Sequence, residues 1–255
     1  MSLSKPAMAQ LHIWSTLLET KAGRDKVFRT VGYSAKLISG LLVRFKSANT
    51  TGVKKLQTLS EAISNLRVMT RLLDGVSMVT ESIDYGTGSS EPDVLVRVCN
   101  VMQNVLYLLY YPCEHIAWAG SVKLMTVDVN KWYDRSDVFW VFALIFSLVS
   151  YIHLLRKLYV QERKLAREAA RKTGPAVGSP EYVKMHKAIK DRRKNLVLGF
   201  VQEGCDFMNA IHWLPSGYLW AEKFPPYVVG FFGSISSFIG LYKNYRSAAA
   251  ASASG

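Results

Sequence analysis

The side chains most often used in catalysis and metal binding are few in this chain, and their spacing suits neither task. No pair of histidines forms HExxH or another metal-ligand spacing; the five are His12, His115, His153, His186 and His212. The adjacent Cys113, Glu114 and His115 resemble a site, but consecutive side chains on a helix point in different directions. We therefore interpret them as a structural cluster. GxSxG, Walker and GxGxxG motifs are also absent, so we expect no enzyme activity, no cofactor and no metal.

The cysteine content indicates a reducing environment. The three cysteines, Cys99, Cys113 and Cys205, cannot all pair within one chain, and no CxxC motif occurs. We expect reduced thiols rather than a disulfide framework.

The remaining chemistry is that of positive charge. The chain of 255 residues has 32 Lys and Arg against 19 Asp and Glu, a net charge of +13, yet it is 49% hydrophobic. A strongly basic chain favours phosphate, on nucleic acid or on a membrane surface. The densest basic run, Lys187–Lys194, is either a set of contacts to lipid headgroups or a solvated helix face. Nucleic-acid binding would require interleaved aromatic residues or a known motif, and neither is present, so we expect no nucleic-acid partner.

The charge is concentrated in two segments. Residues 1–74 carry 12 Lys and Arg against 4 Asp and Glu, whereas residues 75–137 carry 4 against 8. Residues 138–155 carry no charge, and residues 156–223 carry 14 basic against 7 acidic residues.

The uncharged run 138–155 predicts a first transmembrane helix. Its 18 residues would rise about 27 Å as a helix, close to the thickness of the hydrocarbon core. Tryptophan and tyrosine residues lie near both ends, as in an interfacial belt. The alternative is a buried helix of a soluble core, but few such helices are apolar on every face.

A second transmembrane helix is predicted over residues 224–242, a run of 19 residues without charge. Its small residues recur at spacings of 3, 4 and 3, which places them on one face: Gly230, Gly233, Ser237 and Gly240. Such a seam lets another helix approach closely, so we expect neighbouring copies to associate through it. The alternative is that glycine is simply common in membrane helices.

Residues 53–73 form the clearest amphipathic pattern, with Gly75 as a plausible end. The apolar stripe consists of Val53, Leu56, Leu59, Ile63, Leu66, Met69 and Leu73, and the cations beside it are Lys54, Lys55, Arg67 and Arg71. Arg24 to Lys46 shows a similar basic amphipathic pattern. Two interpretations remain open for both helices. Each could lie in the headgroup plane as a wedge, or bury its stripe in a helical bundle.

Three further helices complete the predicted fold. An apolar helix is predicted from Val94 to Tyr110, ended by Pro112; its polar residues Asn100, Gln103 and Asn104 argue against a membrane span. The first span should continue as a helix through residues 156–172, and after a Pro- and Gly-containing break a helix should run over about 181–212.

The fold class is therefore all-α: a helical integral membrane protein with amphipathic N-terminal helices and two transmembrane helices. The predicted organisation is an amphipathic cytosolic region, a first span, a basic helical hairpin, a second span and a short low-complexity tail. These parts cover residues 1–137, 138–155, 156–223, 224–242 and 243–255.

Three blocks of sequence resemble the peroxisomal membrane protein 11 family. Residues 23–42, GRDKVFRTVGYSAKLISGLL, resemble its N-terminal signature. Residues 109–120, LYYPCEHIAWAG, and 212–237, HWLPSGYLWAEKFPPYVVGFFGSISS, resemble the gamma (C) type. Position 32 is Gly, where other branches have Gln, which also favours the gamma type.

The resemblance implies a multi-pass protein of the peroxisomal membrane that promotes protrusion, elongation and proliferation before fission. It implies homo-oligomers, hetero-oligomers with sister members, and contact with a tail-anchored fission adaptor and a dynamin-like GTPase. It also implies that an N-terminal amphipathic helix bends the bilayer, and the match falls on residues 53–73 with Lys54, Lys55, Arg67 and Arg71 on the headgroups.

The resemblance places both termini in the cytosol and residues 156–223 in the matrix. The basic character of that segment would favour the cytosol by the positive-inside rule, but that rule describes translocon insertion and peroxisomal proteins can insert after synthesis. We follow the family topology. Two alternatives for the function are a pore or metabolite channel lined by Asn100, Gln103, Asn104 and the small-residue seam, and a soluble basic nucleic-acid binder.

Overall fold

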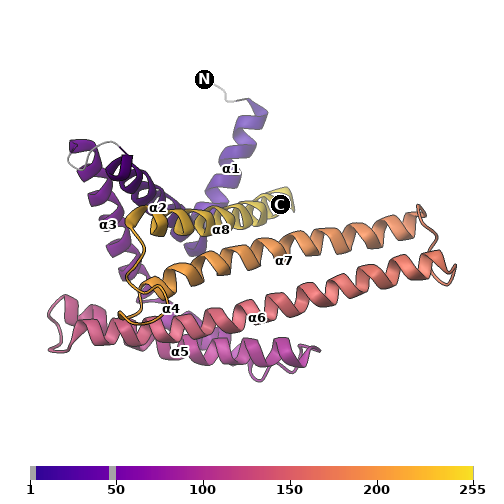
Figure 1. Ribbon diagram of the computed structural model, residues 1–255. Helices are drawn as coiled ribbons and strands as arrows, with labels where there is room; N and C mark the ends of the chain where they lie inside the picture. Colours follow the sequence, from indigo (N-terminus) through magenta and orange to yellow (C-terminus); the bar gives the residue numbers. More distant parts are fainter. Residues whose placement is uncertain (1–3, 46–49, 255) are drawn as a thin grey trace.

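The computed structural model describes residues 4–45 and 50–254, which form eight α-helices and no strand (Figure 1). The helices are α1 (Lys5–Glu19), α2 (Lys21–Phe45), α3 (Thr51–Arg71), α4 (Asp74–Tyr85), α5 (Val94–Ser121), α6 (Val129–Ala170), α7 (Pro180–His212) and α8 (Pro226–Ser254). The all-α fold class is confirmed. Lys46, the last residue of the predicted second amphipathic helix, lies outside the described residues.

Helices α5 and α6 form an antiparallel hairpin joined by residues 122–128. Aspartates begin both helices: the Asp93 carboxylate accepts hydrogen bonds from the backbone N–H groups of Leu95 and Val96, and Asp128 accepts one from Lys131. Such caps satisfy donors that have no partner inside the helix. Helix α6 has 42 residues and contains the first predicted span together with most of its predicted continuation, ending at Ala170 rather than at residue 172.

Helix α5 is longer than expected, because it passes through Pro112 and ends at Ser121. Proline removes one helical hydrogen bond, but α5 packs along α6 and α4, which supports the helix on both sides of the proline. Within the described residues, α5 and α6 are the two helices long and apolar enough to cross a membrane, so α5 is a candidate span although its polar residues led us to expect otherwise. Helix α8, which contains most of the second predicted span, does not pass that test, so its membrane crossing stays a prediction.

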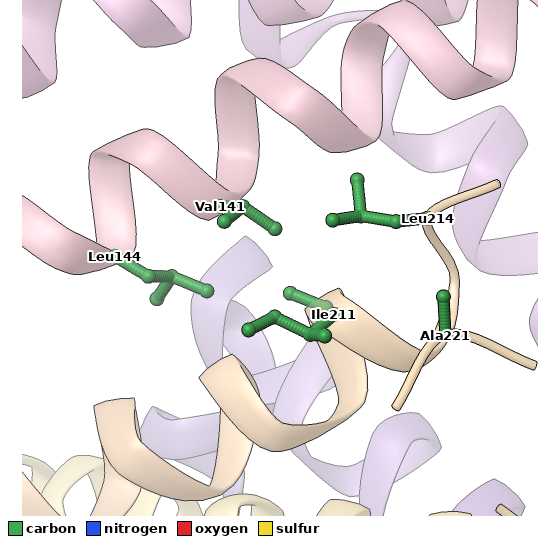
Figure 2. Close-up of a cluster of buried hydrophobic side chains, with 6 residues drawn as sticks. Val141, Leu144, Ile211, Leu214 and Ala221 are labelled. Carbon is green, nitrogen blue, oxygen red and sulfur yellow. The ribbon is translucent and has the colours of Figure 1, made fainter. Parts of the chain in front are cut away.

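Helix α7 runs back along α6, and the two extend together beyond the other helices (Figure 1). A small cluster of Leu158, Leu165 and Ile189 joins them in the extended part. A larger cluster joins α6, the end of α7 and the connection to α8 (Figure 2): Val141, Leu144, Ala210, Ile211, Leu214 and Ala221. The rings of Trp140 and Trp213 stack beside it with centroids 5.6 Å apart.

The N-terminal helices are joined to the rest of the fold mainly through α8. Helix α2 contacts α8 and α3, and α1 contacts α8. The predicted helix 53–73 ends at Arg71, and Gly75 lies in the first turn of α4 rather than at a helix end. A Cβ at Gly75 would lie 3.2 Å from His115 Cε1, so this glycine lets α4 approach α5. Residues 243–254, predicted as a low-complexity tail, continue α8 as helix.

Candidate functional site

The small-residue seam of α8 is buried and receives helix α2. A Cβ at Gly230 would lie 2.5 Å from the backbone nitrogen of Leu37, and a Cβ at Gly233 would overlap the Tyr33 ring. Ser237 is buried, and its hydroxyl donates to the Gly233 carbonyl at 2.6 Å. A seam of small residues therefore exists, but it receives a helix of the same chain rather than the helix of a neighbouring copy that the sequence led us to expect.

The predicted apolar stripe of α3 is divided between two faces of the helix. Val53 and Ile63 are buried, and Leu56 is half-buried. In contrast, four residues of the same stripe have between 41% and 72% of their surface exposed: Leu59, Leu66, Met69 and Leu73. The residues of α3 that face inward are Val53, Ser60, Ile63 and Arg67. Each exposed residue of the stripe lies six positions after one of them, which corresponds to a rotation of about 120° around the helix. One face of α3 therefore packs on α2, and a different face is left open.

The exposed apolar face continues beyond α3. Val76, Val79 and Ile83 of α4 have 73%, 47% and 73% of their surface exposed. We call these six exposed residues of α3 and α4, together with the linking Leu73, the outer face: Leu59, Leu66, Met69, Leu73, Val76, Val79 and Ile83. A series of large exposed apolar side chains of this extent is typical of a surface that contacts a membrane or another protein.

The four cations predicted to contact headgroups also separate into two pairs. Lys54 and Lys55 are exposed at the start of α3. Arg67 and Arg71 turn inward, where Arg67 Nε donates to Asp25 Oδ1 at 2.7 Å and Arg71 Nε donates to Glu114 Oε1 at 3.1 Å. The headgroup role of the two arginines stays a prediction; in the structure they join α3 to α2 and α5.

A polar cavity of about 470 Å³ lies between α2, α3, α5, α6 and α7. Its charged lining residues are Lys26, Arg29, Lys36, Arg67, Arg71, Glu114, Asp137, Glu203 and Asp206. Its aromatic lining residues are Tyr33, Tyr107, Tyr110, Tyr111, Tyr133, Trp140 and Trp213. Among the residues named in the sequence analysis, Gly32, Ile63, Arg67, Arg71 and Glu114 line it.

The arginines of the cavity are all paired with carboxylates. Arg29 and Asp206 are both buried and form a two-pronged ion pair, with Arg29 Nη1 donating to Asp206 Oδ2 at 3.3 Å. Burial opposes the charge of Arg29, but the Asp206 carboxylate raises the pKa of the guanidinium above its ordinary value. A pair of this kind fixes α2 against α7, because removing one partner would leave the other charge buried.

Four other charged residues line the cavity without such a partner. Within residues 4–45 and 50–254, no ion pair is formed by Lys26, Lys36, Asp137 or Glu203. Burial lowers the pKa of Lys26, and the nearby Arg29 adds to that effect. Burial, assisted by Asp206, raises the pKa of the Glu203 carboxyl to about 7.

Sequence reasoning missed most of this cavity. Glu114 was interpreted as structural, and it does hold Arg71, while the Tyr110 hydroxyl donates to the same carboxylate at 2.9 Å. Glu203 and Asp206 are the only Asp, Glu, Lys or Arg residues in the run 196–214, and that isolation was an available signal. Two of the three amides proposed for a pore are engaged elsewhere: Asn100 donates to the Tyr85 hydroxyl at 3.1 Å, and Gln103 donates to the Cys99 carbonyl at 3.3 Å.

Comparison with known proteins gives a consistent result over nearly the whole chain. The model of the family described as Peroxisomal biogenesis factor 11 (PEX11) matches residues 11–245. Peroxisomal membrane protein 11C of Homo sapiens is 33% identical over 96% of this chain and 99% of its own length. The Mus musculus protein of the same name is 34% identical over 91% of this chain and 93% of its own. Human Peroxisomal membrane protein 11A is 26% identical over 86% of this chain and 90% of its own length. No solved structure matches significantly.

Proposed function

Because the chain belongs to the peroxisomal biogenesis factor 11 family, whose members serve peroxisome biogenesis and proliferation, we propose that it remodels the peroxisomal membrane by inserting the outer face into one leaflet. In this proposal the protein is not an enzyme. Insertion into one leaflet expands that leaflet alone, which favours the curvature needed for protrusion and elongation before fission.

The observation that carries the proposal is the outer face of α3 and α4. Its apolar residues are exposed although α3 has a second face that packs on α2. Burying a side chain of this size in an apolar environment contributes about 1.5–3 kcal/mol, so seven of them supply a substantial driving force for lipid contact. The exposed Lys54 and Lys55 lie at the start of the same helix, where anionic headgroups would attract them.

The rest of the proposal concerns placement and partners. We propose that α6 crosses the membrane over residues 138–155 and that the N-terminus lies in the cytosol. A single further span over residues 226–242, with both termini in the cytosol, would put α7 on the side opposite α2, and the Arg29–Asp206 ion pair between α7 and α2 is incompatible with that arrangement. Oligomers with copies of itself and with sister members, and contact with a fission adaptor and a dynamin-like GTPase, belong to the same proposal. Since α2 covers the seam of α8, oligomer contacts in this arrangement use other surfaces.

Vesicle remodelling tests the proposal. The full-length protein, reconstituted with vesicles that contain anionic phospholipid, should convert them into tubules seen by electron microscopy. The double variant Leu66→Gln/Met69→Gln should not, because it places two amides in the inserting surface. A matched control, Val183→Gln/Val197→Gln, changes two exposed apolar residues of α7 and should tubulate like the unmodified protein. Normal tubulation by the outer-face variant would contradict the proposal.

A further inference from the structure

The polar cavity contains two lysines and two carboxyl groups that form no ion pair within the described residues. After the three arginine–carboxylate pairs are formed, Lys26 and Lys36 remain on α2, and Asp137 and Glu203 remain on α6 and α7. Burial raises the pKa of Asp137 to about 8 and that of Glu203 to about 7, so a cationic group placed beside them would favour their ionised forms. A simple anion bound in the cavity would be repelled by the two acids, and a simple cation would be repelled by the two lysines. A ligand that carries both a negative and a positive group complements all four residues.

The uncharged lining is suited to the same kind of ligand. Trp140, Trp213 and five tyrosines line the cavity, and aromatic rings attract ammonium groups. Tyrosine hydroxyls and lysine ammonium groups are hydrogen-bond donors to phosphate oxygens. Within the described residues, Arg29 Nε is buried with no hydrogen-bond partner, so the wall of the cavity also holds an unused donor.

The position of the cavity along α6 indicates where such a ligand would come from. Ser136, Asp137 and Trp140 line the cavity at the point where the predicted span 138–155 begins. The end of a transmembrane helix lies at the depth of the lipid headgroups. The volume of about 470 Å³ falls within the range of sites that bind small molecules.

We propose that this cavity binds a zwitterionic headgroup that joins a phosphate to an ammonium group, as in phosphocholine and phosphoethanolamine. The phosphate lies toward Lys26 and Lys36, and the ammonium group lies toward Glu203, Asp137 and the aromatic rings. The headgroup belongs either to a membrane phospholipid or to a soluble molecule of the same chemistry. The lipid source rests on the membrane placement of α6 in the proposed function, whereas the cavity chemistry does not.

Binding to the purified full-length protein in detergent tests the site, with the fluorescence of the stacked Trp140 and Trp213 as the signal. The probes are phosphocholine, phosphoethanolamine, inorganic phosphate, choline, and short-chain phosphatidylcholine below its micelle concentration. At least one whole headgroup should bind tenfold or more tightly than inorganic phosphate or choline. Tighter binding of the short-chain lipid than of phosphocholine supports a phospholipid source, and equal binding supports the soluble source.

Two cavity variants and two matched controls locate the binding. Lys26→Met and Glu203→Gln remove the charge while keeping a side chain of similar size, and each should weaken headgroup binding about tenfold. Lys184→Met and Glu81→Gln remove the same charges from exposed positions and should bind like the unmodified protein. If circular dichroism shows that Lys26→Met is not folded, Lys36→Met takes its place.

Two results would overturn the inference: inorganic phosphate or choline binding as tightly as the whole headgroup, or folded cavity variants binding without loss. The vesicle assay separates this outcome from the proposed function. A Glu203→Gln protein that loses headgroup binding should still tubulate vesicles, and a Leu66→Gln/Met69→Gln protein that no longer tubulates should still bind the headgroup.

Discussion

Helices α2 and α3 have the same kind of sequence, a basic amphipathic helix, yet the structure uses them differently. In α2, small residues are buried and neighbouring helices come close: a Cβ at Gly40 would lie 2.6 Å from the backbone nitrogen of Tyr227, and one at Gly32 would lie 3.0 Å from Ile63 Cγ2. In α3, leucine and methionine remain exposed on the outer face. Small residues thus make α2 a packing centre, although it also exposes large apolar side chains such as Ile38 and Phe45, whereas α3 lies at the rim with the outer face exposed.

The ion pair that fixes α2 to α7 should have the largest effect on stability. Replacing Asp206 by Ala leaves Arg29 buried without its carboxylate, so we expect a loss of about 3–5 kcal/mol. The exposed Asp191→Ala on the same helix should change stability by less than about 0.5 kcal/mol. Denaturant unfolding in detergent, followed by circular dichroism, measures both; equal stability of the two variants would show that the pair does not anchor α2.

The stability of the folded protein should also depend on pH through Glu203, which lies near this pair. Its pKa is raised from 4.5 to about 7 in the folded protein, so folding takes up a proton between these values. The contribution of this group is therefore fully present below about pH 4.5, falls as the pH rises, and is lost above about pH 7, a change of up to about 3 kcal/mol.

The variant Glu203→Gln isolates that effect. It cannot ionise, so its stability should fall less between pH 5 and 8 than that of the unmodified protein, and it should be the more stable of the two at pH 8. Thermal unfolding across this pH range gives the comparison. Parallel curves for the two proteins would mean that Glu203 does not titrate in the buried environment described.

The contact between α2 and α8 should respond to a single methyl group. Gly233→Ala places a Cβ against the Tyr33 ring, and we expect a loss of about 1–3 kcal/mol. Gly204→Ala in α7 adds the same methyl group where no atom lies within 4 Å, so it should stabilise by up to about 1 kcal/mol through helix propensity. Thermal unfolding distinguishes the two; a stable Gly233→Ala protein would mean that α2 and α8 are not held this closely.

The outer face of α3 should show the smallest effect on folding. Leu66→Gln/Met69→Gln changes side chains that have 41% and 55% of their surface exposed, so we expect a change in unfolding free energy within about 0.5 kcal/mol per site. Co-flotation with anionic vesicles should instead fall clearly. A large loss of stability would show that this face is packed in the folded protein and is not free for lipid.

Helix positions and the overall class followed from local patterns. The 3.6-residue periodicity and the uncharged run 138–155 are properties of neighbouring residues, and the helices they predicted were found. Where one local rule was applied alone it failed: Pro112 did not end α5, and Gly75 did not end α3. In both places contacts with a neighbouring helix outweighed the local preference.

The cavity and the partner of the seam depended on contacts between distant parts of the chain. Arg29 and Asp206 are separated by 177 positions, and Arg71 and Glu114 by 43. Periodicity places a residue on a face of its helix, but it does not say which helix covers that face. For this reason the sequence alone determined that the chain is all-α and basic and that it contains an uncharged run long enough to span a membrane. It also determined that three segments resemble one family. Only the tertiary structure decided that the glycine seam receives α2, that the stripe of α3 is divided, and that nine charged residues meet around one cavity.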